Sequence, residues 1–363
     1  MTHPDVITAV AVWPVDVPLT DRFVIARGAL ARAEVGFVRV RVAGGVVGFG
    51  EIAPFEALTG ETRDASLEVA RRLGTAIVGS RASEWPALGS TLAALAPGEP
   101  AARTGIESAV VDALARLRGQ PLYRFFGGAD VRPRETDITI PILDEARVDQ
   151  LAAQWHVRGF RTFKLKVGGD VDADVGRVAR LAKRFADVSF VLDANQGFDR
   201  AQAHAFVRGV AGMKSRIRLI EQPLARDDLE GMAGLRAERV APIAADESVF
   251  TLDDARAVIA AGAADCVNLK IMKSGLAETI AIAGAVRTAG LDLMVGGMME
   301  TRLAMSFSLA LALGLGGVTH LDLDTPLLMD ADPHEGGYGY EGPNLTVWNG
   351  PGIDLKPRVQ PAL

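Results

Sequence analysis

The sequence has few of the residues that would point to a disulfide-stabilised, histidine-ligated or nucleic-acid-binding protein. Its one cysteine, Cys266, excludes an internal disulfide and lies in an apolar run, so we expect a buried and unreactive thiol. The five histidines show no metal-binding spacing. The net charge of −6 and the lack of any basic run argue against a nucleic-acid partner.

Long apolar runs and a basic N-terminal segment are also missing. The longest apolar stretch, residues 305–318, is interrupted by two serines and three glycines, so it predicts a buried helix and not a membrane span. Asp5 and Asp16 flank the first apolar stretch, and no basic segment precedes it. We therefore expect no signal peptide, no membrane partner and a cytoplasmic location.

What the sequence does have is a regular alternation of short β-rich and helical segments. Eight β-rich segments begin at intervals of 23 to 28 residues: 137–142, 162–167, 189–193, 217–221, 243–246, 266–271, 292–295 and 318–322. Strands that alternate with helices at this spacing predict βαβ units and a parallel sheet. Because no glycine-rich phosphate loop follows the first strand, the pattern favours a closed (β/α) barrel over a doubly wound sheet.

The two ends of the chain have a different pattern. Residues 6–12 and 35–42 predict strands, and residues 41–50 predict a hairpin. The segment that follows the repeat is rich in glycine and proline. We expect three parts: an α+β capping domain over residues 1–130, a barrel over residues 131–325, and a C-terminal segment over residues 326–363 that packs back on the cap.

Acidic residues end three consecutive predicted strands: Asp193, Glu221 and Asp246. The carboxyl ends of parallel barrel strands meet at one end of the barrel, so these side chains should converge. Each acid alone could pair with a local lysine or cap a helix. Three buried like charges in register instead favour a bound cation, and oxygen ligands favour Mg²⁺, with Mn²⁺ as a substitute.

Three lysines belong to the same predicted end of the barrel. Lys164 and Lys166 lie two residues apart on one strand and so point to the same face, where each ammonium group should lower the pKa of the other towards that of a general base. Lys270 ends the sixth strand, on the opposite side of the barrel. A metal between opposed lysines predicts proton removal beside a substrate carboxylate through a metal-stabilised enediolate.

The order of these motifs along the chain resembles that of the enolase superfamily, specifically its muconate-lactonising subgroup. The matching motifs are Lys164-Leu165-Lys166, Asp193-Ala194-Asn195, Glu221-Gln222-Pro223, Asp246-Glu247-Ser248, Asn268-Leu269-Lys270, Met298-Met299-Glu300 and Asp322-Leu323-Asp324. They span the whole predicted barrel. The resemblance implies a modified (β/α)₇β barrel of the TIM type, with an α+β cap built from both ends of the chain.

The resemblance also implies roles for individual residues. It makes Lys166 and Lys270 the acid/base pair and places Mg²⁺ on the three acids. It also implies that Lys164 and Met298 contact the substrate. Asn195, Glu247 and Glu300 would lie behind the residues that contact the substrate or the metal.

Within the subgroup, Asp322 and Asp324 resemble the pair that holds the substrate's α-ammonium group in dipeptide epimerases, such as those acting on L-Ala-D/L-Glu. The alternative is a turn in which Asp324 caps its own backbone. We predict a homo-oligomeric enzyme that epimerises dipeptides at the α-carbon of the C-terminal residue. N-acylamino-acid racemisation, o-succinylbenzoate synthesis and muconate cycloisomerisation remain alternatives on the same site, and a non-catalytic metal-binding barrel is a remote one.

The side-chain specificity of such relatives depends on a mobile loop in the cap, here expected over residues 22–32 with Phe23 and Arg27 as candidates. A second loop over residues 54–60 contributes Phe55. An acid-selective relative would carry an arginine where the resemblance places Gly28, so a preference for glutamate is not implied.

Overall fold

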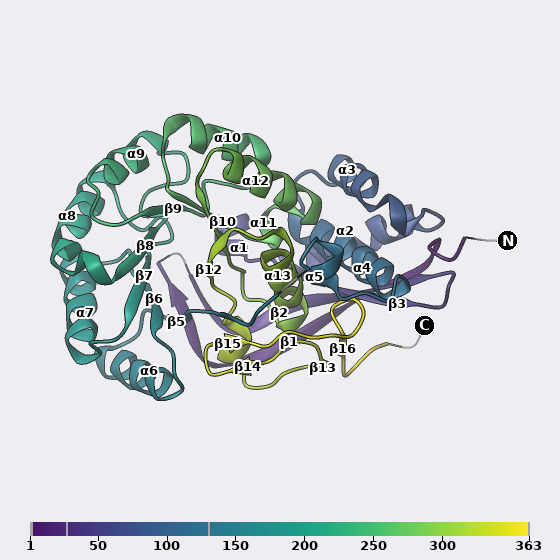
Figure 1. The fold of residues 1–363 in the computed structure, drawn as a ribbon, viewed down its shortest axis with the longest axis horizontal. Coiled ribbons are helices and arrows are strands. Elements are labelled where there is room, and N and C mark those ends of the chain that lie inside the picture. The colour runs from purple at the N-terminus through teal and green to yellow at the C-terminus, as the bar shows by residue number, and fades with distance from the viewer. Residues whose placement is uncertain (1–2, 27, 130, 362–363) are drawn as a thin grey trace.

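The computed structural model describes residues 3–26, 28–129 and 131–361 (Figure 1). Its centre is an eight-stranded parallel sheet whose strands neighbour one another in chain order. These strands are β5 (Ile138–Ile140), β6 (Thr162–Lys166), β7 (Ser189–Asp193), β8 (Ile217–Glu221), β9 (Ile243–Ala245), β10 (Cys266–Leu269), β11 (Asp292–Val295) and β12 (Val318–Leu321). The backbone N–H of Asp137, just before β5, donates to Leu321 O of β12 at 3.0 Å, so the two edges of the curled sheet meet.

Helices connect successive strands and cover the outside of the sheet (Figure 1). They are α6 (Glu145–Val157), α7 (Val171–Arg184), α8 (Arg200–Val210), α9 (Leu229–Ala237), α10 (Leu252–Ala261), the short α11 (Ile271–Ser274) with α12 (Leu276–Thr288), and α13 (Arg302–Leu315). Most begin at an aspartate or threonine whose side chain accepts a backbone N–H of the first turn, as in α6 at Asp144 and α10 at Thr251. The predicted (β/α)₇β barrel is confirmed, and α13 is the buried helix predicted over residues 305–318.

The middle of the barrel interior is apolar. Side chains from five consecutive strands form one buried cluster there: Val191, Leu219, Ala244, Cys266 and Met294. Cys266 is fully buried, as predicted. Because neighbouring strand residues point to opposite faces, residues two positions further along these strands also face the interior, at the carboxyl end of the barrel.

The N-terminal part forms an antiparallel sheet with helices packed on it. The sheet consists of β1 (Ile7–Ile25), β2 (Gly28–Val42) and β3 (Val47–Ile52), and the helices are α1 (Glu56–Thr59), α2 (Arg63–Ile77), α3 (Trp85–Leu95), α4 (Pro100–Leu117) and α5 (Leu122–Phe125). Helix α4 lies directly against β3. A Cβ on Gly50 would come 2.1 Å from Gly105 O, so only glycine permits this approach.

The specificity loop predicted over residues 22–32 is wrong in one respect: strands β1 and β2 extend through most of it. Phe23 pairs with Leu30 and Ile25 with Gly28, because the alternating pattern of both strands continues to the tip of this hairpin. Arg27 lies outside the described residues. The second predicted loop contains the single-turn helix α1, which follows the buried Phe55.

The C-terminal segment runs back along helices α4 and α5. It contains the single turn η3 (Thr325–Leu328) and the strands β13 (His334–Gly336), β14 (Tyr340–Glu341), β15 (Asn344–Leu345) and β16 (Leu355–Pro357), of which β15 pairs with β4 (Arg134–Glu135). Asp112 of α4 accepts the N–H of Ile353 at 2.8 Å. Among the described helices, none combines the length and apolar character that crossing a membrane requires.

One buried carboxylate joins the cap to the barrel. Glu51 of β3 accepts the backbone N–H of Thr301 at 2.8 Å and that of Ala304 at 2.9 Å, at the start of α13. Burial raises the pKa of Glu51 to about 7, against the opposing effect of these hydrogen bonds. The cap therefore sits over the carboxyl end of the barrel, where the predicted site lies.

Candidate active site

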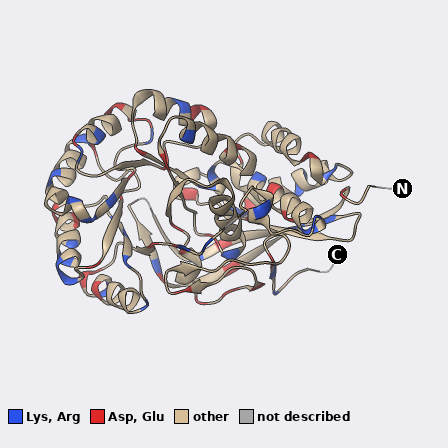
Figure 2. Cartoon of the chain, viewed as in Figure 1, with Lys and Arg blue, Asp and Glu red and all other residues tan. Residues whose placement is uncertain are grey.

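The carboxyl end of the barrel gathers charged side chains that are shielded from water. On the outer helices, acidic and basic residues are interspersed (Figure 2). Inside the barrel, Lys166 is the register partner of Asp193, and Asp193 is that of Glu221. Asp246 follows the end of β9, and all three acids are fully buried. The three predicted metal ligands thus share one end of the barrel interior.

Two lysines bind the first two of these acids. Lys166 Nζ donates to Asp193 Oδ2 at 2.6 Å. Lys164 Nζ lies 3.1 Å from the same oxygen and 2.8 Å from Glu221 Oε2. Burial alone would raise the pKa of Asp193, but the charges of Lys166 and Lys164 outweigh it and lower that pKa to about 2. Burial and the charge of Asp193 together raise the pKa of Glu221.

Two further lysines bind the third acid. Lys270 Nζ donates to Asp246 Oδ2 at 2.7 Å, and Lys273 Nζ donates to Asp246 Oδ1 at 2.6 Å. Against the effect of burial, both charges hold the pKa of Asp246 well below its usual range. Asn268, two residues before Lys270, donates to Glu221 Oε1 at 2.7 Å. Lys273 and Asn268 therefore position two of the three predicted metal-binding carboxylates, Asp246 and Glu221.

The predicted lowering of the lysine pKa by mutual repulsion is wrong for Lys164. Burial lowers its pKa, but the carboxylates of Asp322 and Glu221 outweigh burial and raise that pKa well above the ordinary value. The pKa of Lys270 is also raised, because Asp246 outweighs burial and the charge of Lys164. Acids that lie within hydrogen-bonding distance dominate over a neighbouring ammonium group.

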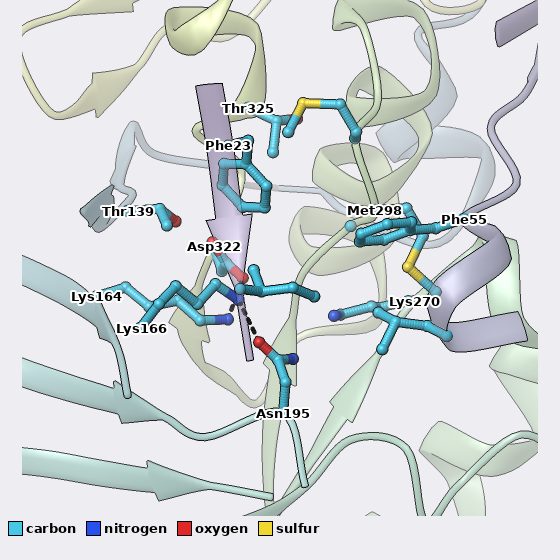
Figure 3. A pocket seen from close by; sticks show the side chains of 14 residues that line it. Phe23, Phe55, Thr139, Lys164, Lys166, Asn195, Lys270, Met298, Asp322 and Thr325 are labelled. Atoms are coloured by element: carbon cyan, nitrogen blue, oxygen red, sulfur yellow. Dashed lines mark hydrogen bonds and ion pairs between the residues drawn. The ribbon is translucent and has the colours of Figure 1, made fainter. Parts of the chain in front are cut away.

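A cavity lies between this end of the barrel and the cap, and we call it the inner cavity (Figure 3). Lys166 and Lys270 point into it from opposite sides (Figure 3). Lys166 Nζ also donates to Asn195 Oδ1 at 3.2 Å, and Asn195 Nδ2 donates to Glu247 Oε1 at 3.2 Å. A substrate carbon held between the two lysines would present its two faces to two different amines.

Part of the wall of the inner cavity is apolar. The cap contributes Phe23, Ile25, Phe55 and Leu58, and the segment after β11 contributes Met298 and Met299. Glu300 accepts the backbone N–H of Met298 at 2.7 Å and so fixes the turn that carries it. Burial raises the pKa of Glu300 to about 8.

A second acidic group borders the cavity. Carboxylate oxygens of Asp137, Asp322 and Asp324 lie within 4.8 Å of one another, and all three residues are buried. Asp322 accepts a hydrogen bond from Lys164 Nζ at 2.6 Å. Asp324 accepts the N–H of Thr139 at 2.5 Å, which is a contact between the first and last strands where the barrel closes. The alternative prediction, in which Asp324 caps its own turn, is wrong because its side chain makes no capping bond.

Sequence reasoning missed Asp137 and Thr139. Both lie at the first barrel strand, and they meet Asp322 and Asp324 only because the first and last strands close the barrel. The one indication in the sequence is that Asp137 directly precedes an apolar strand. A buried carboxylate there costs free energy unless it has partners.

Comparison with known proteins gives a consistent result over almost the whole chain. Residues 7–127 match the N-terminal domain of mandelate racemase/muconate lactonizing enzyme, and residues 147–360 match the enolase C-terminal domain-like family. The aromatic dipeptide epimerase of Herpetosiphon aurantiacus is 38% identical over 97% of this chain and 99% of its own length.

Two solved structures are similar to the whole fold. The substrate-liganded complex of the L-Ala-D/L-Glu epimerase from Bacillus subtilis has a TM-score of 0.93 at 32% identity, covering 96% of this chain and 98% of that one. The dipeptide epimerase from Enterococcus faecalis complexed with Mg and L-Leu-L-Tyr has a TM-score of 0.92 at 31% identity, covering 96% and 99%. The chain belongs to the mandelate racemase/muconate lactonizing enzyme family, with an enolase-like C-terminal domain.

Proposed function

We propose that this chain is a divalent-metal-dependent isomerase that epimerises dipeptides at the α-carbon of the C-terminal residue. The observation that carries the proposal is the opposition of Lys166 and Lys270 across the inner cavity, with Asp322 beside them. Relatives from three bacteria are dipeptide epimerases by name, and one of these was crystallised with Mg and a dipeptide. The same chemistry fits the geometry of this site.

We propose Asp193, Glu221 and Asp246 as the ligands of Mg²⁺. The donor set fits, because all three offer buried oxygen ligands at one end of the barrel, as a hard cation requires. The lysines that contact these oxygens would have to release them. When bound, the ion would stabilise negative charge on the substrate carboxylate. Mn²⁺ in its place is part of the proposal, to be tested by exchanging the metal.

The two lysines account for inversion. The neutral amine on one side accepts the α-proton, and the ammonium group on the other side donates a proton to the opposite face of the same carbon. Asn195 positions the Lys166 amine through its hydrogen bond, and Glu247 in turn holds Asn195. Lys164, already bound to Asp322, would contact the substrate carboxylate, and Met298 its side chain.

Asp322 and Asp324 supply the feature that favours dipeptides over the other candidate substrates. A free α-ammonium group beside them would gain charge-assisted hydrogen bonds. N-acylamino acids, succinylbenzoate precursors and muconate have no such cation and would leave the acidic group unmatched. A non-catalytic metal-binding barrel would have no need of two opposed lysines.

Three further points belong to the proposal. The chain divides into a cap over residues 1–130, a barrel over residues 131–325 and a returning segment over residues 326–363. It is cytoplasmic and forms a homo-oligomer, which light scattering of the purified protein would test.

Proton NMR in D₂O with Mg²⁺ tests the reaction itself. We expect loss of the C-terminal α-proton signal of L,L-dipeptides, appearance of the L,D diastereomer, and loss of both after EDTA treatment. Exchange with N-acylamino acids and with no dipeptide would refute the proposal in favour of a racemase.

A further inference from the structure

A second pocket opens beside the inner cavity, between the tip of the cap hairpin and helix α6, and we call it the outer pocket. Its floor is apolar and is made by Leu151 and Trp155 of α6 together with Leu327 and Leu328 of η3. Gln154 lies on its rim and is exposed to solvent. The outer pocket contains none of the lysines or the acids of the proposed metal site.

The outer pocket and the inner cavity share two lining residues. Phe23 and Thr139 line both. Figure 3 shows these two residues on the side of the inner cavity where Asp322 and Thr325 lie, away from Lys270. Thr139 also donates its backbone N–H to Asp324, so the outer pocket begins beside the acidic group.

Two arginines lie at the outer pocket, Arg147 and Arg158. Arg147 makes two hydrogen bonds to Asp21, at 3.0 and 2.6 Å. The guanidinium group of Arg158 lies over the ring of Trp155, 4.2 Å from its centroid. An occupant therefore gains chiefly from apolar contact with the floor.

We propose that the outer pocket binds the side chain of the substrate's N-terminal residue and selects large apolar or aromatic ones. The proposal rests on the proposed function. An ammonium group held at Asp322 and Asp324 places the carbon one bond away beside Thr139, so its side chain extends past Phe23 into the outer pocket. The side chain of the reacting C-terminal residue stays in the inner cavity, between Lys166 and Lys270.

The test is the dependence of kcat/KM on the N-terminal residue. The wild-type protein should process L-Phe-L-Ala and L-Leu-L-Ala about tenfold or more faster than L-Ala-L-Ala, since one large apolar group in a matching pocket accounts for such a ratio. Gln154→Trp places an indole over the outer pocket from an exposed helix position. It should remove this preference and leave L-Ala-L-Ala nearly unchanged.

Val157→Trp is the matched control, because Val157 is an exposed residue of the same helix that does not line the outer pocket. It should behave as the wild-type protein does. The proposal is overturned if the wild-type protein shows no preference for a large N-terminal residue. It is also overturned if Gln154→Trp lowers the rates for all dipeptides equally or changes none.

A binding measurement separates this proposal from the proposed function. Trp155 forms part of the floor, so the difference in fluorescence between the wild-type protein and Trp155→Phe reports occupancy without turnover. L-Phe-L-Ala should change this difference signal and L-Ala-L-Ala should not. Such a change without epimerisation would refute the proposed reaction and uphold the outer pocket, whereas no change with either dipeptide would refute the outer pocket.

Discussion

Two groups of three buried acids lie at the same end of the barrel, and they differ in their counter-charges. The metal-side acids, Asp193, Glu221 and Asp246, are bound by Lys164, Lys166, Lys270 and Lys273. Among the described residues, the amine-side acids, Asp137, Asp322 and Asp324, form an ion pair with one lysine, Lys164, through Asp322. Buried carboxylates at the same end of the barrel thus meet a different electrostatic environment in each group.

The difference appears in the pKa values. Lysine charges lower the pKa of Asp193 to about 2 against the effect of burial. Burial and the charge of Asp322 raise the pKa of Asp324 to about 7. Burial and the charges of Asp322 and Asp324 raise the pKa of Asp137 well above its ordinary value. The lysine charges favour the ionised forms of Asp193 and Asp246, which suits a divalent cation. Burial and mutual repulsion favour the neutral forms of Asp137 and Asp324, so the amine-side group carries less negative charge and suits an ammonium group.

Replacing a metal-side acid should have the largest effect. Glu221→Gln keeps the shape of the side chain but removes the charge, and we expect kcat/KM to fall by about 10³-fold or more, since a metal ion contributes several kcal/mol to charge stabilisation. Mg²⁺ should raise the Tm of the wild-type protein and not that of Glu221→Gln. The control, Asp322→Asn, should keep the Mg²⁺-dependent rise in Tm. If Mg²⁺ raised the Tm of Glu221→Gln as much as that of the wild-type protein, the assignment of ligands would be contradicted.

Replacing an ionised amine-side acid should have an intermediate effect. Asp322→Asn should lower kcat/KM for dipeptides by about 10- to 100-fold, as expected for lost hydrogen bonds to a charged group. Any exchange with N-acylamino acids should stay the same. Asp137→Asn should change the rate for dipeptides by less than about threefold, because burial and the charges of Asp322 and Asp324 favour the neutral form of Asp137. Equal losses in both variants would show that the two acids do not differ in charge.

The smallest expected effect is that of pH on the free energy of unfolding. Between pH 5 and pH 8 this effect should vary with pH for an amine-side acid and stay constant for a metal-side acid. The unfolded state ionises Asp324 near pH 4 and the native state near pH 7, so this residue costs stability progressively as the pH rises between these values. Asp324→Asn should therefore gain stability relative to the wild-type protein from pH 5 to pH 8, on the order of 1 kcal/mol per unit of pKa shift. Urea unfolding in EDTA at each pH measures this difference.

Asp193→Asn is the counterpart to that experiment. The native pKa of Asp193 is lowered to about 2, so its contribution to stability is complete above the unfolded pKa near 4 and is lost as the pH falls towards 2. The variant should be less stable than the wild-type protein by the same amount at every pH from 5 to 8. A deficit that varies across this range, or a flat difference for Asp324→Asn, would contradict the charge states assigned to the two groups.

The metal-side group was predictable from the sequence, and the amine-side group only in part. Asp193, Glu221 and Asp246 each end a strand in a repeat of nearly constant length, so their convergence follows from the βαβ pattern alone. Asp322 and Asp324 were found through the resemblance of their motif. Asp137 was missed because its proximity to them depends on closure between the first and last strands, which no local pattern encodes.

The charge states were not predictable from spacing. Lys164 and Lys166 are neighbours on one strand, and from this the sequence predicts a lowered pKa. The pKa of Lys164 is instead raised, because three carboxylates lie within hydrogen-bonding distance of its Nζ atom. They belong to Asp193, Glu221 and Asp322, each on or just after a different strand. The extension of β1 to Ile25 and the start of β2 at Gly28 were also missed, since the expected loop came from the resemblance and not from the alternation of the residues themselves.

The face specificity of proton exchange in two lysine variants tests the central claim most directly. Each variant, Lys166→Ala and Lys270→Ala, would be incubated with Mg²⁺ in D₂O. One sample would contain an L,L-dipeptide and another its L,D diastereomer, and the loss of the α-proton signal would be followed by NMR. We predict that neither variant epimerises, and that one retains exchange only with the L,L form while the other retains exchange only with the L,D form. Exchange of the same diastereomer by both variants, or epimerisation by either at the wild-type rate, would contradict the two-lysine account.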